Sequence, residues 1–282
     1  MHHPLLVKLI RLYFKLFSSI APNFTAKMAH RLFHYPINSK RKNFNEKTLK
    51  TPEKFTIYFD RETTLQGYRW GELTDPKVLL VHGWSTTSRS MSHIIEALLQ
   101  NSYQVISYDA LRHGDSLGSL SDLGNWAKSV TLVMDKIGEV EAIVAHSFGG
   151  AAVTVASKLG LHTKKLVLLA PINDIEKVSN DFGKNLGIPL HILKIMRDYT
   201  WKNNEKILSH YGEDWQDIFL SDFKVPTLIY HDSNDKEIGI EHSQKLTKQW
   251  TWAKLIETKG LGHRKILDDK EVVQGVVSFI KA

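Results

Sequence analysis

The spacing of hydrophobic residues along the chain changes character near residue 53. Before that point, Leu5, Leu9, Leu12 and Leu16 recur at helical spacing, so residues 4–20 are predicted as a helix. A second short helix is expected at about residues 25–34. From Glu53 onward, residues 54–59 and 65–70 alternate polar and apolar side chains, as the strands of a hairpin do. Continuous apolar runs follow, which are typical of strands covered on both faces; they lie at 78–81, 105–106, 142–144, 166–169, 227–230 and, more weakly, 254–256.

Helical patterns separate these apolar runs, at residues 90–100, 123–136, 148–158, 240–249 and 270–280. Alternation of this kind predicts an α/β fold with a mostly parallel central sheet and helices on both faces. The interval between residues 169 and 227 is far longer than one crossover needs and is rich in large apolar side chains. We therefore expect a helical cap at about 171–222 within an α/β domain over 53–282. Residues 1–52 are predicted as a basic, amphipathic helical extension without a core of its own.

The composition is that of an ordinary globular protein. Of the 282 residues, 42% are hydrophobic and 24% are charged. The chain has no cysteine, which excludes thiol catalysis, disulfides and cysteine-ligated zinc. No metal-ligand cluster and no phosphate-binding glycine loop stands out, so neither a metal nor a cofactor is expected.

The formal net charge is +7, and part of the excess lies in the extension, at Lys8, Arg11, Lys15, Lys27, Arg31 and residues 40–42. No nucleic-acid-binding module accompanies these residues, so a nucleic-acid partner is not expected. The charges within residues 4–20 argue against a membrane-spanning helix and against a signal peptide. Two interpretations of this helix remain, packing on the protein body or peripheral contact with a membrane interface. The expected location is cytoplasmic, with membrane association as the open alternative.

One stretch indicates chemistry, the segment Ala145-His-Ser-Phe-Gly149 between an apolar strand and a helix rich in small residues. A serine at a tight strand-to-helix turn forms a nucleophile elbow, which exposes its hydroxyl at the strand end. The amide of Phe148 then lies at a helix N-terminus, where developing negative charge is stabilised. The usual pattern has glycine at the position of Ala145, which is the mildest departure because that position needs a small side chain.

The partners that such a serine needs also occur, each after its own strand. A serine requires a base to take its proton and an acid to orient that base. Asp235 follows the strand at 227–230, and His263 follows the last strand in a glycine-containing loop. Asp232 is the nearest rival for the acid role. The early segment His82-Gly83-Trp84 also follows a strand, and the backbone amides of Trp84 and Phe148 are predicted to form an oxyanion hole.

From about Phe55 to its end, the chain resembles the α/β-hydrolase superfamily. The residues that carry the resemblance are His82-Gly83-Trp84, the loop Asp109–Ser116, the elbow at Ser147, Asp235 and His263, in the chain order Ser, Asp, His. Arg112 replaces a glycine that is usual in the Asp109 loop. The resemblance implies that His113 and Asp115 are structural, and we also expect a structural role for His82.

These observations predict a serine hydrolase, most simply a carboxylic-ester hydrolase working through an acyl-enzyme on a small molecule with an apolar acyl part. Thioesterases, lactonases, carbon–carbon bond hydrolases and acyltransferases share this triad and remain alternatives. An alternative of another class is a non-catalytic, ligand-binding or membrane-associated module on a hydrolase scaffold.

Overall fold

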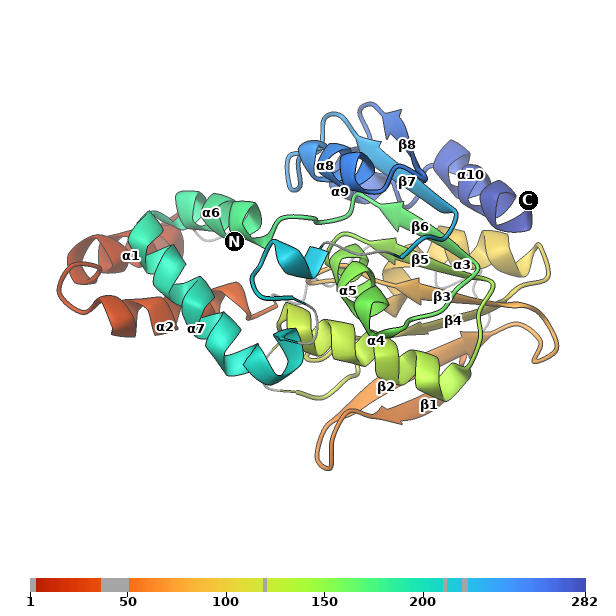
Figure 1. Cartoon of the computed structure of the whole chain (residues 1–282), viewed down its shortest axis with the longest axis horizontal. Coiled ribbons are helices and arrows are strands. Elements are labelled where there is room, and N and C mark those ends of the chain that lie inside the picture. Colours follow the sequence, from red (N-terminus) through yellow and green to blue (C-terminus); the bar gives the residue numbers. More distant parts are fainter. Residues whose placement is uncertain (1–3, 37–50, 119–120, 210–211, 220–222) are drawn as a thin grey trace. The chain divides into compact units, whose positions relative to one another are not determined.

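The computed structural model describes residues 4–36, 51–118, 121–209, 212–219 and 223–282 (Figure 1). The predicted basic triplet at residues 40–42 lies outside these described residues, as does most of the expected connection up to residue 52. The chain divides into two compact units. The helical unit combines Met1–Tyr35 with Asp174–Ile218, and the sheet unit combines Pro36–Asn173 with Phe219–Ala282.

The sheet unit is built on one eight-stranded sheet. Its strands are β1 (Glu53–Tyr58), β2 (Thr64–Trp70), β3 (Lys77–Val81), β4 (Gln104–Tyr108), β5 (Ala142–His146), β6 (Lys165–Leu169), β7 (Thr227–Asp232) and β8 (Ala253–Thr258). They lie in the order β1-β2-β4-β3-β5-β6-β7-β8. The β1–β2 and β2–β4 pairs are antiparallel, and the β4, β3, β5, β6, β7 and β8 strands are parallel to one another. The predicted α/β class with a mostly parallel sheet is confirmed.

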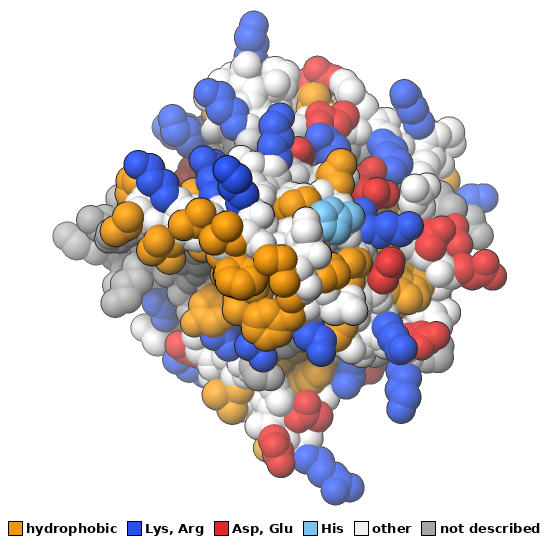
Figure 2. All heavy atoms as spheres, turned by 90° about the vertical axis from the view of Figure 1, so that its left-hand side faces the viewer, with side chains coloured by type: hydrophobic (Ala, Val, Ile, Leu, Met, Phe, Trp, Pro, Cys, Tyr) orange, Lys and Arg blue, Asp and Glu red, His pale blue; other side chains and the backbone are white. Residues whose placement is uncertain are grey.

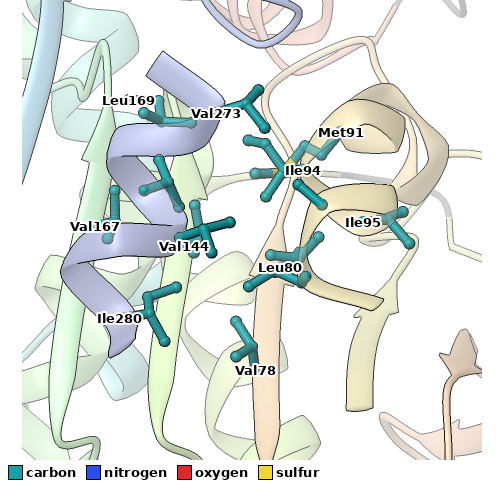
Figure 3. Close-up of a cluster of buried hydrophobic side chains, with 14 of the residues drawn as sticks. Val78, Leu80, Met91, Ile94, Ile95, Val144, Val167, Leu169, Val273 and Ile280 are labelled. Carbon is teal, nitrogen blue, oxygen red and sulfur yellow. The ribbon is translucent and has the colours of Figure 1, made fainter. Parts of the chain in front are cut away.

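Helices cover both faces of this sheet because its inner strands are apolar on both sides. They are α3 (Ser92–Leu99), α4 (Leu123–Ile137), α5 (Phe148–Ala156), α8 (Glu241–Gln249), α9 (Gly262–Lys265) and α10 (Lys270–Lys281), with 3₁₀ turns η1 (Ser88–Met91) and η2 (Ser157–Leu159). On one face, α3 and α10 enclose a buried cluster with alternate residues of the central strands (Figure 3). Leu80 and Val144 belong to this cluster, whereas Val81 and Leu168 point the other way and meet α5. This alternation follows from the two-residue period of a strand.

The helical unit contains α1 (Pro4–Phe17), α2 (Pro22–Phe33), α6 (Ile175–Leu186) and α7 (Leu190–Leu208), and the 3₁₀ turn η3 (Asp217–Phe219) begins at its end. The extension and the cap segment, which the sequence analysis treats as separate, share one buried cluster here. Its members come from both segments: Phe14, Ala26, Ala29, Leu186, Ile188, Ile192, Leu193 and Met196. Helices this short need tertiary packing to be stable, so each segment supplies the partner that the other lacks.

Across the described residues, no helix combines the length and the apolar character that crossing a bilayer would require.

The packing of the sheet makes a prediction about Leu80, which is fully buried beneath α3. Replacing Leu80 with Ala should lower the free energy of unfolding by about 2–5 kcal/mol, because the transfer energy of the lost atoms and the cavity add. Urea denaturation would measure the loss. Leu73→Ala is the matched control, since Leu73 is 73% exposed and should change stability by less than about 0.5 kcal/mol. Equal losses in the two variants would contradict the described core.

Candidate active site

Ser147 occupies a strained turn at the carboxyl end of β5. Its backbone has φ 55° and ψ −119°, in a region that residues other than glycine seldom occupy. The Ser147 amide donates to the carbonyl of Leu169 at the end of the neighbouring strand β6 (N···O 2.9 Å), and α5 begins at the next residue. The turn therefore presents the hydroxyl at the edge of the sheet where ligands of parallel sheets bind.

Two glycines allow the backbone to close around this turn. A Cβ atom on Gly149 would collide with the carbonyl oxygens of His82 and Val81, and one on Gly83 would approach the Ser147 Cβ to 3.0 Å. The segment after β3 and the start of α5 thus touch without intervening side chains. Ala145, which departs from the usual glycine, is fully buried in β5 and is accommodated there.

Ser147, His263 and Asp235 lie within hydrogen-bonding distance of one another in that order. The Ser147 Oγ is 2.8 Å from His263 Nε2, and His263 Nδ1 is 2.7 Å from Asp235 Oδ2. An ionised carboxylate can only accept, so Nδ1 carries the proton and Nε2 is free to accept the hydroxyl proton of the serine. All three side chains are largely buried. The residues predicted from sequence for the nucleophile, base and acid are therefore brought together.

The surroundings of Asp235 keep its carboxyl group ionised. Burial by itself raises the pKa of Asp235, but the nearby His231 ring and hydrogen bonds from His263 and the Ile238 amide lower it well below its usual value. Of these groups, His263 and the backbone amides lower the pKa of Asp235 most. The reason is that His231 Nε2 lies 3.6 Å from Oδ2 and only 2.9 Å from the carbonyl of Ile238, to which it donates. A permanent negative charge behind His263 favours its protonated form during a proton transfer.

Asp232, the rival for the acid role, fastens a loop instead. Its carboxylate accepts hydrogen bonds from the Thr258 hydroxyl (2.9 Å) and from the amides of Gly260 (3.3 Å) and Leu261 (2.9 Å). These three donors belong to the end of β8 and the loop that leads to His263. Asp232 thereby sets the path of the loop that carries the histidine.

The amides of Trp84 and Phe148 are available for a ligand, since neither donates a hydrogen bond to any residue that the structure describes. Their side chains meet at 5.3 Å between ring centroids, and each also packs against Trp126. This aromatic group adjoins the serine turn through Phe148, and within it Trp126 is fully buried whereas Trp84 is partly exposed. It is suited to contact with an apolar part of a substrate.

His82 and His113, the other histidines of these loops, hold backbone in place. His82 Nδ1 donates to the Gly83 carbonyl and its Nε2 accepts from the Ala110 amide, so burial, which lowers its pKa, keeps a neutral ring. His113 Nε2 accepts from the amide of Ser85, and its Nδ1 donates to a loop carbonyl. Asp115 pairs with Lys54 at the surface.

Arg112, which stands where the family usually has glycine, has a φ of 61°. That left-handed conformation explains the usual glycine, because a side chain there is disfavoured.

His146 is a neighbour of the site that the sequence analysis did not single out. Its ring is buried and its Nε2 donates to the backbone carbonyl of His263 at 2.9 Å. Burial lowers the pKa of His146 well below its ordinary value, so the ring stays neutral and keeps this single donor. The only sequence signal for it is its place immediately before Ser147.

Beside the Ser147 site, two other kinds of functional site would be a surface hollow and a metal-binding cluster. A hollow of about 710 Å³ lies among Arg69, Trp70, Glu96 and Tyr103, at the amino ends of the parallel strands and away from Ser147. Within the described part of the chain, no group of three or more His, Asp and Glu side chains is arranged to hold a metal ion.

Comparisons with known proteins agree with this geometry. A family model described as "Alpha/beta hydrolase family" matches residues 78–274, more than half of the chain. An esterase from Pyrococcus furiosus has a similar structure, with a TM-score of 0.64 and 18% identity over 88% of this chain and 98% of that one. An esterase from Exiguobacterium antarcticum has a TM-score of 0.61 and 17% identity, over 82% of this chain and 100% of that one. A bromoperoxidase from Bacillus anthracis has a TM-score of 0.62 and 18% identity, over 82% of this chain and 100% of that one. At these identities the likeness concerns the fold. No curated protein matches the chain.

The burial of His113 predicts how the free energy of unfolding changes with pH. Burial lowers its pKa to about 3, so the unfolded chain takes up a proton below pH ~6.5 that the folded chain refuses. Stability contributed by the neutral ring is present above that pH and lost as the pH falls. Between pH 7.5 and 5.0, wild type should lose about 2 kcal/mol of unfolding free energy that the His113→Asn variant does not lose.

Urea denaturation at the two pH values would measure this difference. His162→Asn is the matched control, because His162 is exposed on a loop and its replacement should leave the pH dependence nearly unchanged. A constant gap between wild type and His113→Asn at both pH values would contradict a ring held neutral by burial.

Proposed function

The chain belongs to the alpha/beta hydrolase family and is a hydrolase, and on that premise we propose that it is a serine carboxylic-ester hydrolase acting on a small molecule with an apolar acyl part. The single observation that supports this most strongly is the hydrogen-bonded series Ser147–His263–Asp235 at a strained strand-to-helix turn. Similar folds described as esterases support the choice of an ester. The proposed cap, about residues 171–222, contains α6 and α7.

In the proposed reaction, His263 Nε2 takes the proton of Ser147 as Oγ attacks the ester carbonyl carbon. The carbonyl oxygen becomes an oxyanion, which accepts hydrogen bonds from the amides of Trp84 and Phe148. Asp235 holds the His263 ring in place through Nδ1–H and stabilises its charged form.

Protonated His263 then gives its proton to the leaving alcohol, and the acyl group remains on Ser147. Water, deprotonated by the same nitrogen, attacks the acyl-enzyme and releases the carboxylic acid, which regenerates the serine. The partly exposed ring of Trp84, which packs on buried Trp126, contacts the acyl part. Thioesters and lactones would follow the same steps, and an alcohol in place of water would give acyl transfer.

The nucleophile can be tested by labelling. Wild-type protein should react with a fluorophosphonate probe at Ser147 and hydrolyse short p-nitrophenyl esters, and Ser147→Ala should lose both reactions. The variant should reach background hydrolysis, because no other hydroxyl in the described part of the chain is hydrogen-bonded to His263. Mass spectrometry of the labelled peptide gives the site. Ser278→Ala, which removes an exposed hydroxyl from α10, should behave as wild type. Full hydrolysis by Ser147→Ala would overturn the assignment.

The proposed acid can be tested by comparing Asp235 with Asp232, which lies three residues earlier at the end of β7. Asp235→Asn should lower kcat by about 10²–10⁴-fold, because the amide no longer stabilises charged His263 in the required tautomer. Asp232→Asn should mainly lower the melting temperature, since its contacts are to the Thr258 hydroxyl and loop amides. Steady-state kinetics and thermal melts would measure both. If Asp232→Asn gave the larger loss of kcat without lower stability, the acid would be Asp232.

A further inference from the structure

The helix α1 has two apolar faces, and only one of them is used inside the helical unit. Phe14 is fully buried in the cluster shared with α2, α6 and α7, and Val7, Ile10 and Tyr13 pack partly against the same cluster. A hydrogen bond from Arg11 to the Asn185 carbonyl (2.9 Å) adds to this attachment. The helix is thus held in place by one side.

The second apolar face is exposed. Leu5, Leu9, Leu12 and Leu16 form one row at helical spacing, and each is between 51% and 62% exposed. Exposed apolar side chains continue with Phe17 at the end of α1 and with Ile20 and Phe24 beyond it, of which Ile20 is 77% exposed. Figure 2 shows, on the side where α1 and α2 lie, hydrophobic side chains gathered in one area with Lys and Arg at its margin. Single exposed leucines are ordinary, but a continuous row of this kind marks an interaction surface.

The turn between α1 and α2 is fixed, so this surface is already formed. The Thr25 hydroxyl donates to the carbonyl of Ala21 (2.8 Å), and the Ala21 amide donates to that of Phe17 (2.9 Å). A partner therefore meets an ordered apolar surface, which reduces the entropic cost of binding.

The charged residues of α1 and α2 have one sign. Exposed Lys8 and Lys15 lie on α1 between the buried face and the leucine row, and Lys27 and Arg31 are exposed on α2. The sequence has no Asp or Glu before Glu46, so these basic residues have no acidic neighbour along the chain. Such a surface attracts anions over about 10 Å at ordinary ionic strength.

We propose that this surface, the exposed face of α1 with Ile20 and Phe24, docks the protein peripherally on an anionic lipid bilayer. A basic helix that inserts its apolar side chains among lipid headgroups has this arrangement of faces. With 14 residues, α1 spans about 21 Å and is too short to cross the hydrocarbon core, so it lies in the membrane plane. A second copy of the chain would instead bring two basic helices together.

The experiment is flotation of the full chain with two kinds of vesicle, pure phosphatidylcholine and phosphatidylcholine with 30% phosphatidylglycerol. We expect binding to the anionic vesicles that weakens in high salt, and little binding to the neutral ones. The double variant Leu9→Glu with Leu16→Glu should bind at least about tenfold more weakly, because two exposed anchors become anions. Lys8→Gln with Lys15→Gln should lower binding and reduce its salt dependence.

Matched controls lie in the sheet unit. Leu73→Glu with Leu117→Glu places the same charges at exposed leucines, and Lys136→Gln with Lys270→Gln removes the same charges from exposed helix positions. Both should float as wild type, and circular dichroism should show all variants folded. The proposal is overturned if the full chain does not bind anionic vesicles, or if the α1 variants bind as the controls do. It is also overturned if the leucine variant abolishes self-association, measured by light scattering, while vesicle binding is unchanged.

Discussion

The backbone of Ser147 is held in a conformation that costs on the order of 1–3 kcal/mol, and the rest of the site depends on it. β5 pairs with β3 on one side and with β6 on the other, so the position of its carboxyl end is fixed. Gly149 lets α5 start directly against the carbonyls of β3. Both the position of the Ser147 hydroxyl and the direction of the Phe148 amide follow from this one turn.

The pairing of β7 with β8 brings Asp235 and His263 into reach of that turn. Their register places Asp232 opposite Thr258, so the loops that follow both strands leave the sheet side by side. Asp232 and Asp235 are only three residues apart, yet they do different work. Asp232 binds the loop amides, and Asp235 binds the ring of His263. His146, at the end of the strand that precedes Ser147, adds a third support by donating to the backbone carbonyl of His263.

Much of the fold follows from short-range patterns, which the sequence displays directly. Polar–apolar alternation predicted β1 and β2, and apolar runs predicted the other six strands, within a few residues. Helical spacing predicted α1, α4, α5 and α10. The elbow around Ser147 and the chain order of the proposed triad could also be recognised, because turn geometry restricts which residues stand there. By contrast, His146 could not be recognised, since its partner is a backbone carbonyl 117 residues away.

The sequence by itself determined which faces of α1 are apolar and which are basic, and that the segment after β6 is helical. Periodicity reports the chemistry of a face but not what covers it. Only the tertiary structure decided that Met1–Tyr35 and Asp174–Ile218 share one core, because that contact joins segments far apart in the chain. It also decided that α1 buries Phe14 while the leucine row stays exposed, so the helix packs on the protein and still presents an apolar surface.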